Sequence, residues 1–291
     1  MLRDRYRAIV QTSWDGEAAD ALIALHARRS AESIARFHAA AHGRRMAVVL
    51  TGTDLYRDLP ESREAARSLD LADRIVVLQD DAPRLLRPEW RRKCEVIFQS
   101  ARPLAAARKR AGRLDCVVVG HLREEKDPRT LFAALRRLAP DIPIRVRHIG
   151  APLDAKLGEE ARELARAEPR YRYAGALPHG LARAAMRAAH VLVHPSIAEG
   201  GANVIVEAVA SGTPVIASRI SGNVGMLGAG YPGFFEARDA EGLAALLVRA
   251  LEDPRFLARL REACARRRPL FRPQTEAAAI RRLAAALTAR R

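Results

Sequence analysis

Residues 194–221 read HPSIAEGGANVIVEAVASGTPVIASRIS, and this stretch carries the clearest signals of fold in the chain. An apolar run directly before it predicts a buried strand that ends at His194. The glycine-containing segment 199–203 reads as a loop, and the almost wholly apolar segment 204–210 predicts a buried helix. Ser-Gly-Thr-Pro at 211–214 ends that helix, and an apolar strand begins directly after it. This order of strand, loop, helix and strand indicates a parallel α/β sheet.

The junction between the glycine loop and this helix predicts an anion site. The first turn of a helix offers free N–H groups and the positive end of the helix dipole, which suit phosphate, and Asn203 or a neighbour is expected to cap it. Glu199 at the start of the loop and Glu207 in the helix cannot bind phosphate, but they can accept hydrogen bonds from hydroxyls. Carboxylates beside a phosphate site suggest a sugar nucleotide. As isolated residues, the two glutamates would read more simply as a surface residue and a helix-face carboxylate.

The stretch resembles the E-x7-E region of the retaining glycosyltransferases of family 4. The match runs in order through Pro-Ser, Glu-Gly, the second Glu, and Ala-x-Gly-x-Pro-Val-Ile-Ala-Ser. The resemblance implies the GT-B fold, an α/β architecture of two Rossmann-like, doubly wound parallel-sheet domains that face each other across a cleft. It also implies that Glu199 contacts the donor sugar in the catalytic site and that Glu207 contacts the ribose. The other donor-binding residues that it implies in this stretch are Gly200, Gly201, Ala202, Asn203 and Val204.

Composition narrows the classes of function. The chain has 291 residues, of which 49% are hydrophobic and 5% aromatic, and its formal net charge is +16. This charge favours anionic partners. The arginines are dispersed along the chain and aromatic residues for base stacking are few, so we expect no nucleic-acid partner.

Cysteine usage and hydropathy indicate the cellular environment that the sequence suits. The three cysteines have no regular spacing, which argues against a disulfide framework or a metal site. We expect no cofactor besides the donor substrate. The sequence has no signal-peptide pattern and no apolar run of membrane-spanning length, so it reads as a cytoplasmic protein without stable membrane insertion.

The remaining sequence alternates strand and helix signals, which predicts parallel sheets. Strands are expected at 7–12, 20–26, 45–51, 73–79, 95–99, 115–120, 144–150 and 171–175. Helices are expected at 30–41, 63–71, 83–90, 129–138, 155–167, 181–189, 241–251, 254–268 and 274–289, and a second glycine loop at 221–228. Three parts are therefore expected: an N-terminal domain at 1–110, a nucleotide-sugar domain at 111–273, and a helix at 274–291 that packs back on the first domain.

Two strand ends in the first half predict substrate contacts. Ligands of an open parallel sheet bind beyond the carboxyl ends of its strands, where His26 and the segment 51–56 (TGTDLY) stand. A lone histidine is more often structural. The segment is similar to a histidine-glycine-x-aspartate loop of family 4, with Thr51 in the place of its histidine. The resemblance implies that His26, Thr53 and Asp54 are catalytic-site residues.

The loop after the strand at 115–120 reads HLREEKDP at 121–128. It is similar to the family 4 loop whose arginine and lysine bind the donor diphosphate. Lys126 matches the lysine, whereas His121 stands at the arginine position and Arg123 is expected to supply the missing charge. The alternative for Lys126 is a solvated charge in an ordinary turn.

The N-terminal domain of a GT-B enzyme begins with a strand, a glycine loop and a helix before the first segment present here. On this resemblance about 30 residues, one βα unit, are missing, so we expect the N-terminal domain to be incomplete. The missing loop would normally help to hold the acceptor.

Some segments are specific beyond family 4 in general. They are ADALIALHARRSAESI (19–34), LTGTDLYRDL (50–59), VVVGHLREEKDP (117–128) and SIAEGGANVIVEAVASGTPVIASRISGNVGMLGAGYPGFF (196–235). Together they resemble the small branch of selenosugar synthases of selenoneine biosynthesis. The resemblance implies transfer of the sugar of UDP-N-acetylglucosamine, or a related UDP-sugar such as UDP-glucose, to the selenium of selenophosphate.

The charge pattern fits a metal-independent transfer. Selenophosphate is already nucleophilic and needs positioning more than a strong base, and His26 with nearby arginines could hold it. Lys126, Arg123 and the helix N-terminus after Glu199 would neutralise the departing UDP. The alternatives are a general family 4 transferase with a sugar or lipid acceptor, and a non-catalytic protein that binds UDP-sugars.

Overall fold

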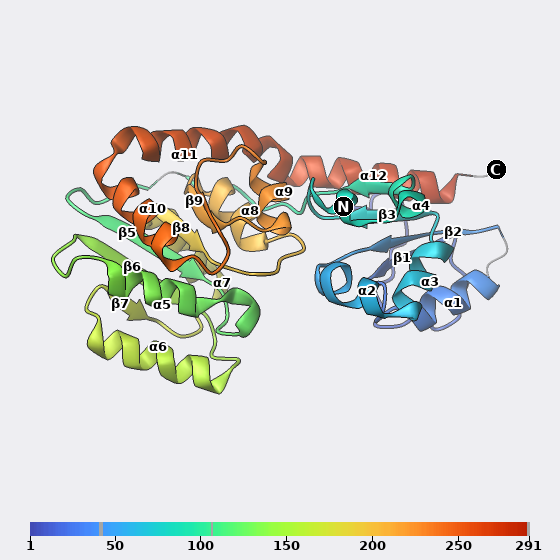
Figure 1. Cartoon of the computed structure of the whole chain (residues 1–291). Helices are drawn as coiled ribbons and strands as arrows, with labels where there is room; N and C mark the ends of the chain where they lie inside the picture. Colours follow the sequence, from blue (N-terminus) through green and yellow to red (C-terminus); the bar gives the residue numbers. More distant parts are fainter. Residues whose placement is uncertain (41–42, 106, 290–291) are drawn as a thin grey trace. The chain divides into compact units, whose positions relative to one another are not determined.

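The computed structural model describes residues 1–40, 43–105 and 107–289, and the chain forms two compact units (Figure 1). The first unit contains residues 1–100 and the chain from Pro273 onward, and the second contains residues 101–272. The division falls ten residues before the boundary expected at 110. The reason is that Lys109, just before the expected boundary, is fastened to the second unit: its Nζ donates to the carbonyls of Arg187 and Ala189, each at 2.5 Å.

The first unit is a parallel sheet with helices on both faces. Its elements are β1 (Ala21–Leu25), α1 (Ala31–Ala40), β2 (Arg45–Val49), η1 (Asp54–Asp58), α2 (Leu59–Glu61), α3 (Arg63–Leu71), β3 (Arg74–Val77), η2 (Ala82–Leu85), α4 (Pro88–Arg91), β4 (Cys94–Val96) and α12 (Pro273–Thr288). The strands follow the order β1-β2-β3-β4. Phe37 of α1 and Leu69 of α3 lie in the core on one face, and Leu283 and Leu287 of α12 lie against Val76 on the other.

Two predictions for this unit were wrong. Residues 7–12 form no strand, and Val10 within them is 93% exposed, because this apolar run pairs with no neighbouring strand. The helix predicted at 83–90 is divided into η2 and α4, since Pro88 disfavours helical backbone at the residue before it.

The second unit is a larger parallel sheet of the same type. Its elements are β5 (Leu114–Val119), η3 (Glu124–Lys126), α5 (Pro128–Arg137), β6 (Ile144–Ile149), α6 (Ala155–Ala167), β7 (Tyr171–Tyr173), α7 (His179–Ala188), β8 (Val191–His194), α8 (Asn203–Ala210), β9 (Val215–Ser218), α9 (Ser221–Leu227), β10 (Phe234–Phe235), α10 (Ala240–Glu252), α11 (Pro254–Arg267) and η4 (Arg268–Phe271). The strands follow the order β10-β9-β8-β5-β6-β7.

The strand order of the second unit reverses between β5 and β8. From β5 the chain proceeds to β6 and β7 on one side, and β8 then returns to the other side of β5. Such a reversal leaves a crevice beyond the carboxyl ends of the two central strands, where ligands of open α/β sheets bind. The loop after β5 and the loop after β8 therefore border the expected ligand position.

The glycine loop predicted at 221–228 was wrong, because Ser221–Leu227 forms the helix α9. Gly222 is needed for close packing and not for a turn, because a Cβ at this position would lie 2.0 Å from the carbonyl oxygen of Glu199. Only glycine allows α9 to lie this close to the loop that follows β8.

Candidate functional site

The two loops at the reversal of the strand order meet through Lys126 and Glu199. Lys126 ends the short turn η3 after β5, and Glu199 stands in the loop after β8. The ammonium of Lys126 donates a hydrogen bond to Oε1 of Glu199. Both side chains are largely buried, with 21% and 11% of their surface exposed. The structure thus brings together the two residues that the sequence predicted separately, 73 positions apart.

A third residue, His194, shares this carboxylate. His194 ends β8, is 3% exposed, and places Nε2 at 3.2 Å from Oε1 of Glu199. Burial alone would raise the pKa of Glu199, but His194 and Lys126 outweigh burial and hold that pKa well below its ordinary value. Burial lowers the pKa of His194, Glu199 opposes this, and the charge of Lys126 adds to it. The cluster therefore contains an ionised glutamate, a lysine and a neutral histidine.

The glycine loop leads into α8 as predicted, but its cap differs. Ala202 occupies the cap position and has no side chain that could accept a hydrogen bond, whereas Asn203 is the first helical residue and is exposed. The expectation that Asn203 caps the helix was therefore wrong for that residue. Gly200 and Gly201 precede the cap, and Val204 lies in the first turn. Without a side-chain cap, the first N–H groups of α8 remain suited to an anion.

Glu207 lies on α8 and is 8% exposed. Its Oε1 is 2.6 Å from Nε2 of His179, the first residue of α7. The sequence did not predict this pair. The side chain of His179 is 73% exposed, so a ligand could displace it from Glu207 at small cost.

The other two predicted donor residues are not joined to this cluster. His121 is exposed, and its Nδ1 accepts a hydrogen bond from the N–H of Ala151 at 2.9 Å, which ties the loop after β5 to the loop after β6. Arg123 is exposed and makes no ion pair with a described residue. Its guanidinium is therefore available to an anion, but no contact in the structure places it beside Glu199.

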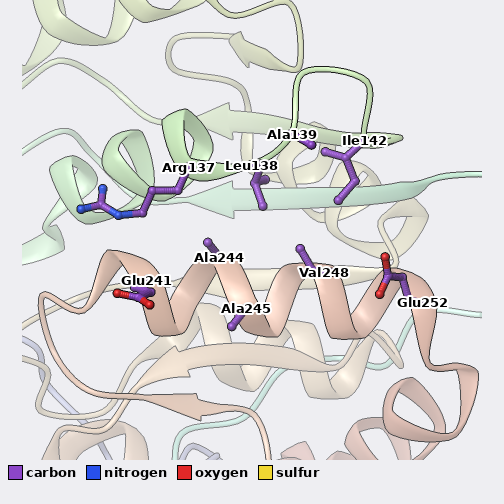
Figure 2. Close-up of a pocket in the computed structure, with 9 residues that line it drawn as sticks. All are labelled: Arg137, Leu138, Ala139, Ile142, Glu241, Ala244, Ala245, Val248 and Glu252. Carbon is purple, nitrogen blue, oxygen red and sulfur yellow. The ribbon is translucent and has the colours of Figure 1, made fainter.

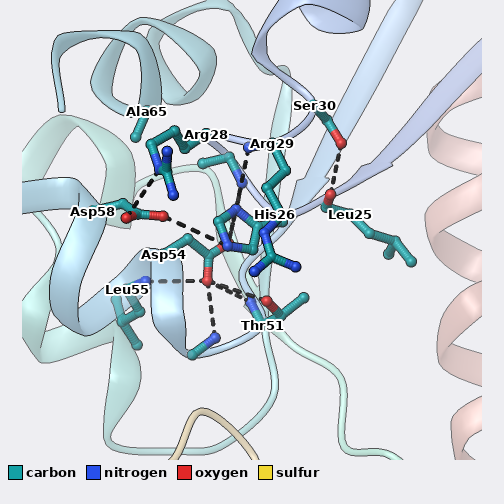
Figure 3. A network of polar contacts seen from close by, with 12 residues as sticks. Leu25, His26, Arg28, Arg29, Ser30, Thr51, Asp54, Leu55, Asp58 and Ala65 are labelled. Atoms are coloured by element: carbon teal, nitrogen blue, oxygen red, sulfur yellow. Dashed lines mark hydrogen bonds and ion pairs between the residues drawn. The ribbon is translucent and has the colours of Figure 1, made fainter. Parts of the chain in front are cut away.

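In the first unit, His26 and two aspartates form the network of Figure 3. His26 follows β1 with φ of 73°, a left-handed conformation that few residues other than glycine adopt. Its Nδ1 accepts a hydrogen bond from the N–H of Arg29 at 3.3 Å. Its Nε2 is buried and lies 3.5 Å from Oδ2 of Asp58. Asp58, which the sequence analysis missed, also pairs with Nε of Arg28 at 3.0 Å.

Asp54 has a structural place in this network. Its side chain is fully buried, and Oδ1 accepts hydrogen bonds from the N–H groups of Thr51, Gly52 and Leu55 at 2.8, 2.9 and 3.1 Å. Oδ2 accepts one from the N–H of Ala27 at 3.1 Å. The carboxylate therefore fastens the loop after β1 to the loop after β2.

Thr53 is exposed, and its side chain caps nothing in η1, the turn that it precedes. Of the predicted residues in this unit, His26 and Asp54 come together, whereas Thr53 stays outside the network. We found no signal in the sequence for Asp58 beyond its position four residues after Asp54.

A separate hollow of the second unit lies elsewhere (Figure 2). It measures about 560 Å³ and is bordered by the carboxyl-terminal end of α5 and one side of α10. Its lining is Arg137, Leu138, Ala139, Ile142, Glu241, Ala244, Ala245, Val248 and Glu252. Lys126 precedes the opposite end of α5, so this shallow apolar groove is separate from the candidate site.

Two features are absent from residues 1–40, 43–105 and 107–289. No group of three or more histidine, cysteine or carboxylate side chains in these ranges is arranged to hold a metal ion. No helix in the same ranges has both the length and the apolar character that crossing a bilayer requires.

Comparison with known proteins identifies relatives of this chain. The profile of the family described as Glycosyl transferases group 1 matches residues 105–267. Glycogen synthase of Mycobacterium tuberculosis is 33% identical over 156 residues, which are 52% of this chain and 37% of that protein. Phosphatidyl-myo-inositol mannosyltransferase of Mycolicibacterium smegmatis is 32% identical over 161 residues, 54% of this chain and 40% of that protein. The matched region thus spans less than half of either relative.

Solved structures resemble both units. Sucrose-phosphate synthase from Thermosynechococcus elongatus has a TM-score of 0.73 at 22% identity and covers 92% of this chain and 73% of its own. Anabaena HepE, solved in complex with UDP and glucose, has a TM-score of 0.70 at 18% identity, with 91% and 77% covered. At these identities the likeness concerns the fold.

Proposed function

This chain belongs to the glycosyl transferases of group 1, and we propose that it transfers a sugar from a UDP-sugar to an acceptor. The family membership and the two Rossmann-like parallel-sheet units agree with the GT-B fold predicted from the sequence. The observation that supports the donor site most directly is the meeting of Lys126 and Glu199 beside the uncapped start of α8. This arrangement suits a nucleoside-diphosphate sugar. At one reversal of the strand order it offers a cation and a helix N-terminus to the diphosphate, and a carboxylate that can accept hydrogen bonds from the sugar.

In this proposal each donor residue has a separate task. Lys126, Arg123 and the first N–H groups of α8 neutralise the negative charge that grows on the diphosphate as its bond to the sugar breaks. Gly200 and Gly201 let the backbone approach the ligand closely. Glu199 accepts a hydrogen bond from a hydroxyl of the sugar. Glu207 accepts one from a ribose hydroxyl, which takes the place of His179. A structural neighbour supports a UDP-sugar as the donor: HepE was solved with UDP and glucose.

For the acceptor, we propose selenophosphate, on the basis of the sequence resemblance to selenosugar synthases. In the transfer, selenium forms a bond to the anomeric carbon while the bond from that carbon to the diphosphate oxygen breaks, and UDP leaves. The end of β1 offers groups that suit a small anion: Arg28 and Arg29 are exposed, and both follow the buried His26 in the sequence. A sugar or lipid acceptor is the alternative.

The test is release of UDP from UDP-N-acetylglucosamine, measured with and without selenophosphate, with mass spectrometry of the products. Release that depends on selenophosphate, together with a selenosugar product, would support both proposals. Release that does not depend on selenophosphate, or that needs a sugar or lipid acceptor, would reject selenophosphate and keep the glycosyl transfer. Tight UDP binding without release under all conditions would reject catalysis in favour of a binding protein.

A further inference from the structure

The cluster of Lys126, Glu199 and His194 has one feature that donor binding must change. A single oxygen, Oε1 of Glu199, holds the ammonium of Lys126 and lies 3.2 Å from Nε2 of His194. Nε2 of His194 is buried and has no well-directed hydrogen bond within the described residues. Lys126 is therefore the cation that pairs with the carboxylate of Glu199, and His194 lies close enough to that carboxylate to pair with it instead.

An anionic donor competes with Glu199 for Lys126. A diphosphate carries two negative charges, and a lysine that turns toward it leaves the glutamate, which is 11% exposed, without its cation. A buried carboxylate without a partner is strongly unfavourable. His194 is the nearest group that can replace the lost cation, and it can do so only by taking up a proton.

We infer that His194 takes a proton from solvent when a diphosphate donor draws Lys126 away, and then replaces the lysine as the cation paired with Glu199. This inference rests on the proposed donor site. His194 acts as a positioning residue in it: it keeps Glu199 ionised and in place while Lys126 serves the phosphates. The exchange also couples donor affinity to pH, because the bound state holds one proton more than the free state.

The surroundings of His194 agree with this exchange. The charged groups that face it are Glu199 from the loop after β8 and Lys126 from the loop after β5. His194 and His148 of β6 both line a small cavity of about 10 Å³. His148 is already engaged at both ring nitrogens, by the hydroxyl of Tyr171 at 2.8 Å and the carbonyl of Gly120 at 3.3 Å. Burial lowers the pKa of His148 to about 4, so it stays neutral and adds no charge near pH 7.

Calorimetry of UDP-glucose binding measures the proton directly. The diphosphate of UDP-glucose is esterified at both ends and does not titrate near neutral pH, so a proton taken up on binding belongs to the protein. Titrations near pH 7 in buffers of different ionisation enthalpy should show uptake of up to one proton per donor by the wild type. Affinity should then rise as pH falls, by at most about tenfold per pH unit, because linkage between proton and donor is reciprocal.

His194→Gln keeps an N–H donor toward Glu199 but cannot gain a proton, so its uptake should vanish and its affinity should lose the pH dependence. His38→Asn, which changes an exposed histidine of α1, should behave as the wild type. Equal proton uptake in the wild type and His194→Gln, or no uptake by a wild type that binds UDP-glucose, would overturn the inference. Absence of any UDP-glucose binding would instead reject the proposed donor site.

A second measurement needs no donor. In Lys126→Met, Glu199 loses its cation permanently, so the pKa of His194 should rise above that of the wild type. NMR titration of the histidine rings would show this, with His194→Gln identifying the signal. An unchanged titration of His194 in Lys126→Met would overturn the inference independently of ligand binding.

Discussion

Replacement of Asp54 by asparagine tests whether this residue is structural, as its contacts indicate, or catalytic, as the sequence resemblance implied. Its carboxylate is fully buried and accepts hydrogen bonds from four backbone N–H groups, those of Ala27, Thr51, Gly52 and Leu55. Asparagine has nearly the same shape. It can present its oxygen to the three donors of the loop after β2, but its NH₂ group then meets the N–H of Ala27.

The expected cost follows from these contacts. One buried N–H loses its acceptor and faces another donor, which costs about 1–3 kcal/mol. The three remaining hydrogen bonds change from a charged to a neutral acceptor and become weaker, since charge-assisted bonds are roughly twice as strong. We therefore expect Asp54→Asn to destabilise the first unit by about 3 kcal/mol. With a typical urea dependence, the unfolding midpoint should fall by roughly 1–2 M.

Tryptophan fluorescence is the appropriate assay. The chain has two tryptophans, and both Trp14 and Trp90 belong to the first unit, so their signal reports on this unit alone. Asp20→Asn, which removes the same charge from an exposed position of the same unit, is the matched control. A shift for Asp54→Asn no larger than that of the control would refute the structural reasoning. Loss of UDP release at unchanged stability would then favour the catalytic interpretation.

Three further predictions concern the second unit. Lys126→Ala should lower the rate of UDP release at least about 100-fold by removing charge-assisted contacts to the leaving group, whereas the exposed Lys156→Ala should not; equal rates would reject the assignment. His179→Ala should raise UDP-sugar affinity about twofold to fivefold by freeing Glu207 from a mostly exposed ion pair, and weaker binding in calorimetry would show that His179 itself contacts the donor. Burial lowers the folded-state pKa of His148 from 6.5 to about 4, so the unfolded chain takes up this proton at a higher pH than the folded chain. The contribution of neutral His148 to the stability of the fold is therefore present above pH 6.5 and lost as the pH falls toward 4. His148→Gln should remove this part of the pH dependence in unfolding followed by circular dichroism, and an unchanged dependence would contradict the reasoning.

The elements that the sequence predicted best are those with local end signals. The helices predicted at 63–71 and 155–167 match α3 and α6 at both ends. Their N-terminal ends are set by Ser62 and Asp154, whose side chains accept hydrogen bonds from the N–H groups of Ala65 and Leu157. Where the deciding contact is distant, the sequence misled. Gly222 reads as a turn residue, but it is glycine because α9 packs on the carbonyl of Glu199.

In the candidate site, too, residues with a local sequence signal could be predicted and residues placed by packing could not. Lys126, Glu199 and Glu207 could be selected from their motifs, since each stands at a fixed distance from a strand end or glycine loop. Their partners could not. The approach of His179 to Glu207 depends on how α7 packs in the unit, and no local pattern encodes it. His194 is close to Glu199 in the sequence, but their contact depends on the path of the loop that follows β8.

The most direct test of the donor site is equilibrium binding of UDP-N-acetylglucosamine to the wild type, Glu207→Gln and Glu252→Gln. Glu252 is an exposed carboxylate of the separate groove on α10, so its variant matches the change in charge. The proposed site predicts binding by the wild type, about tenfold weaker binding by Glu207→Gln through loss of a charged hydrogen bond, and no change for Glu252→Gln. Equal binding by all three proteins, or no binding by the wild type, would contradict it.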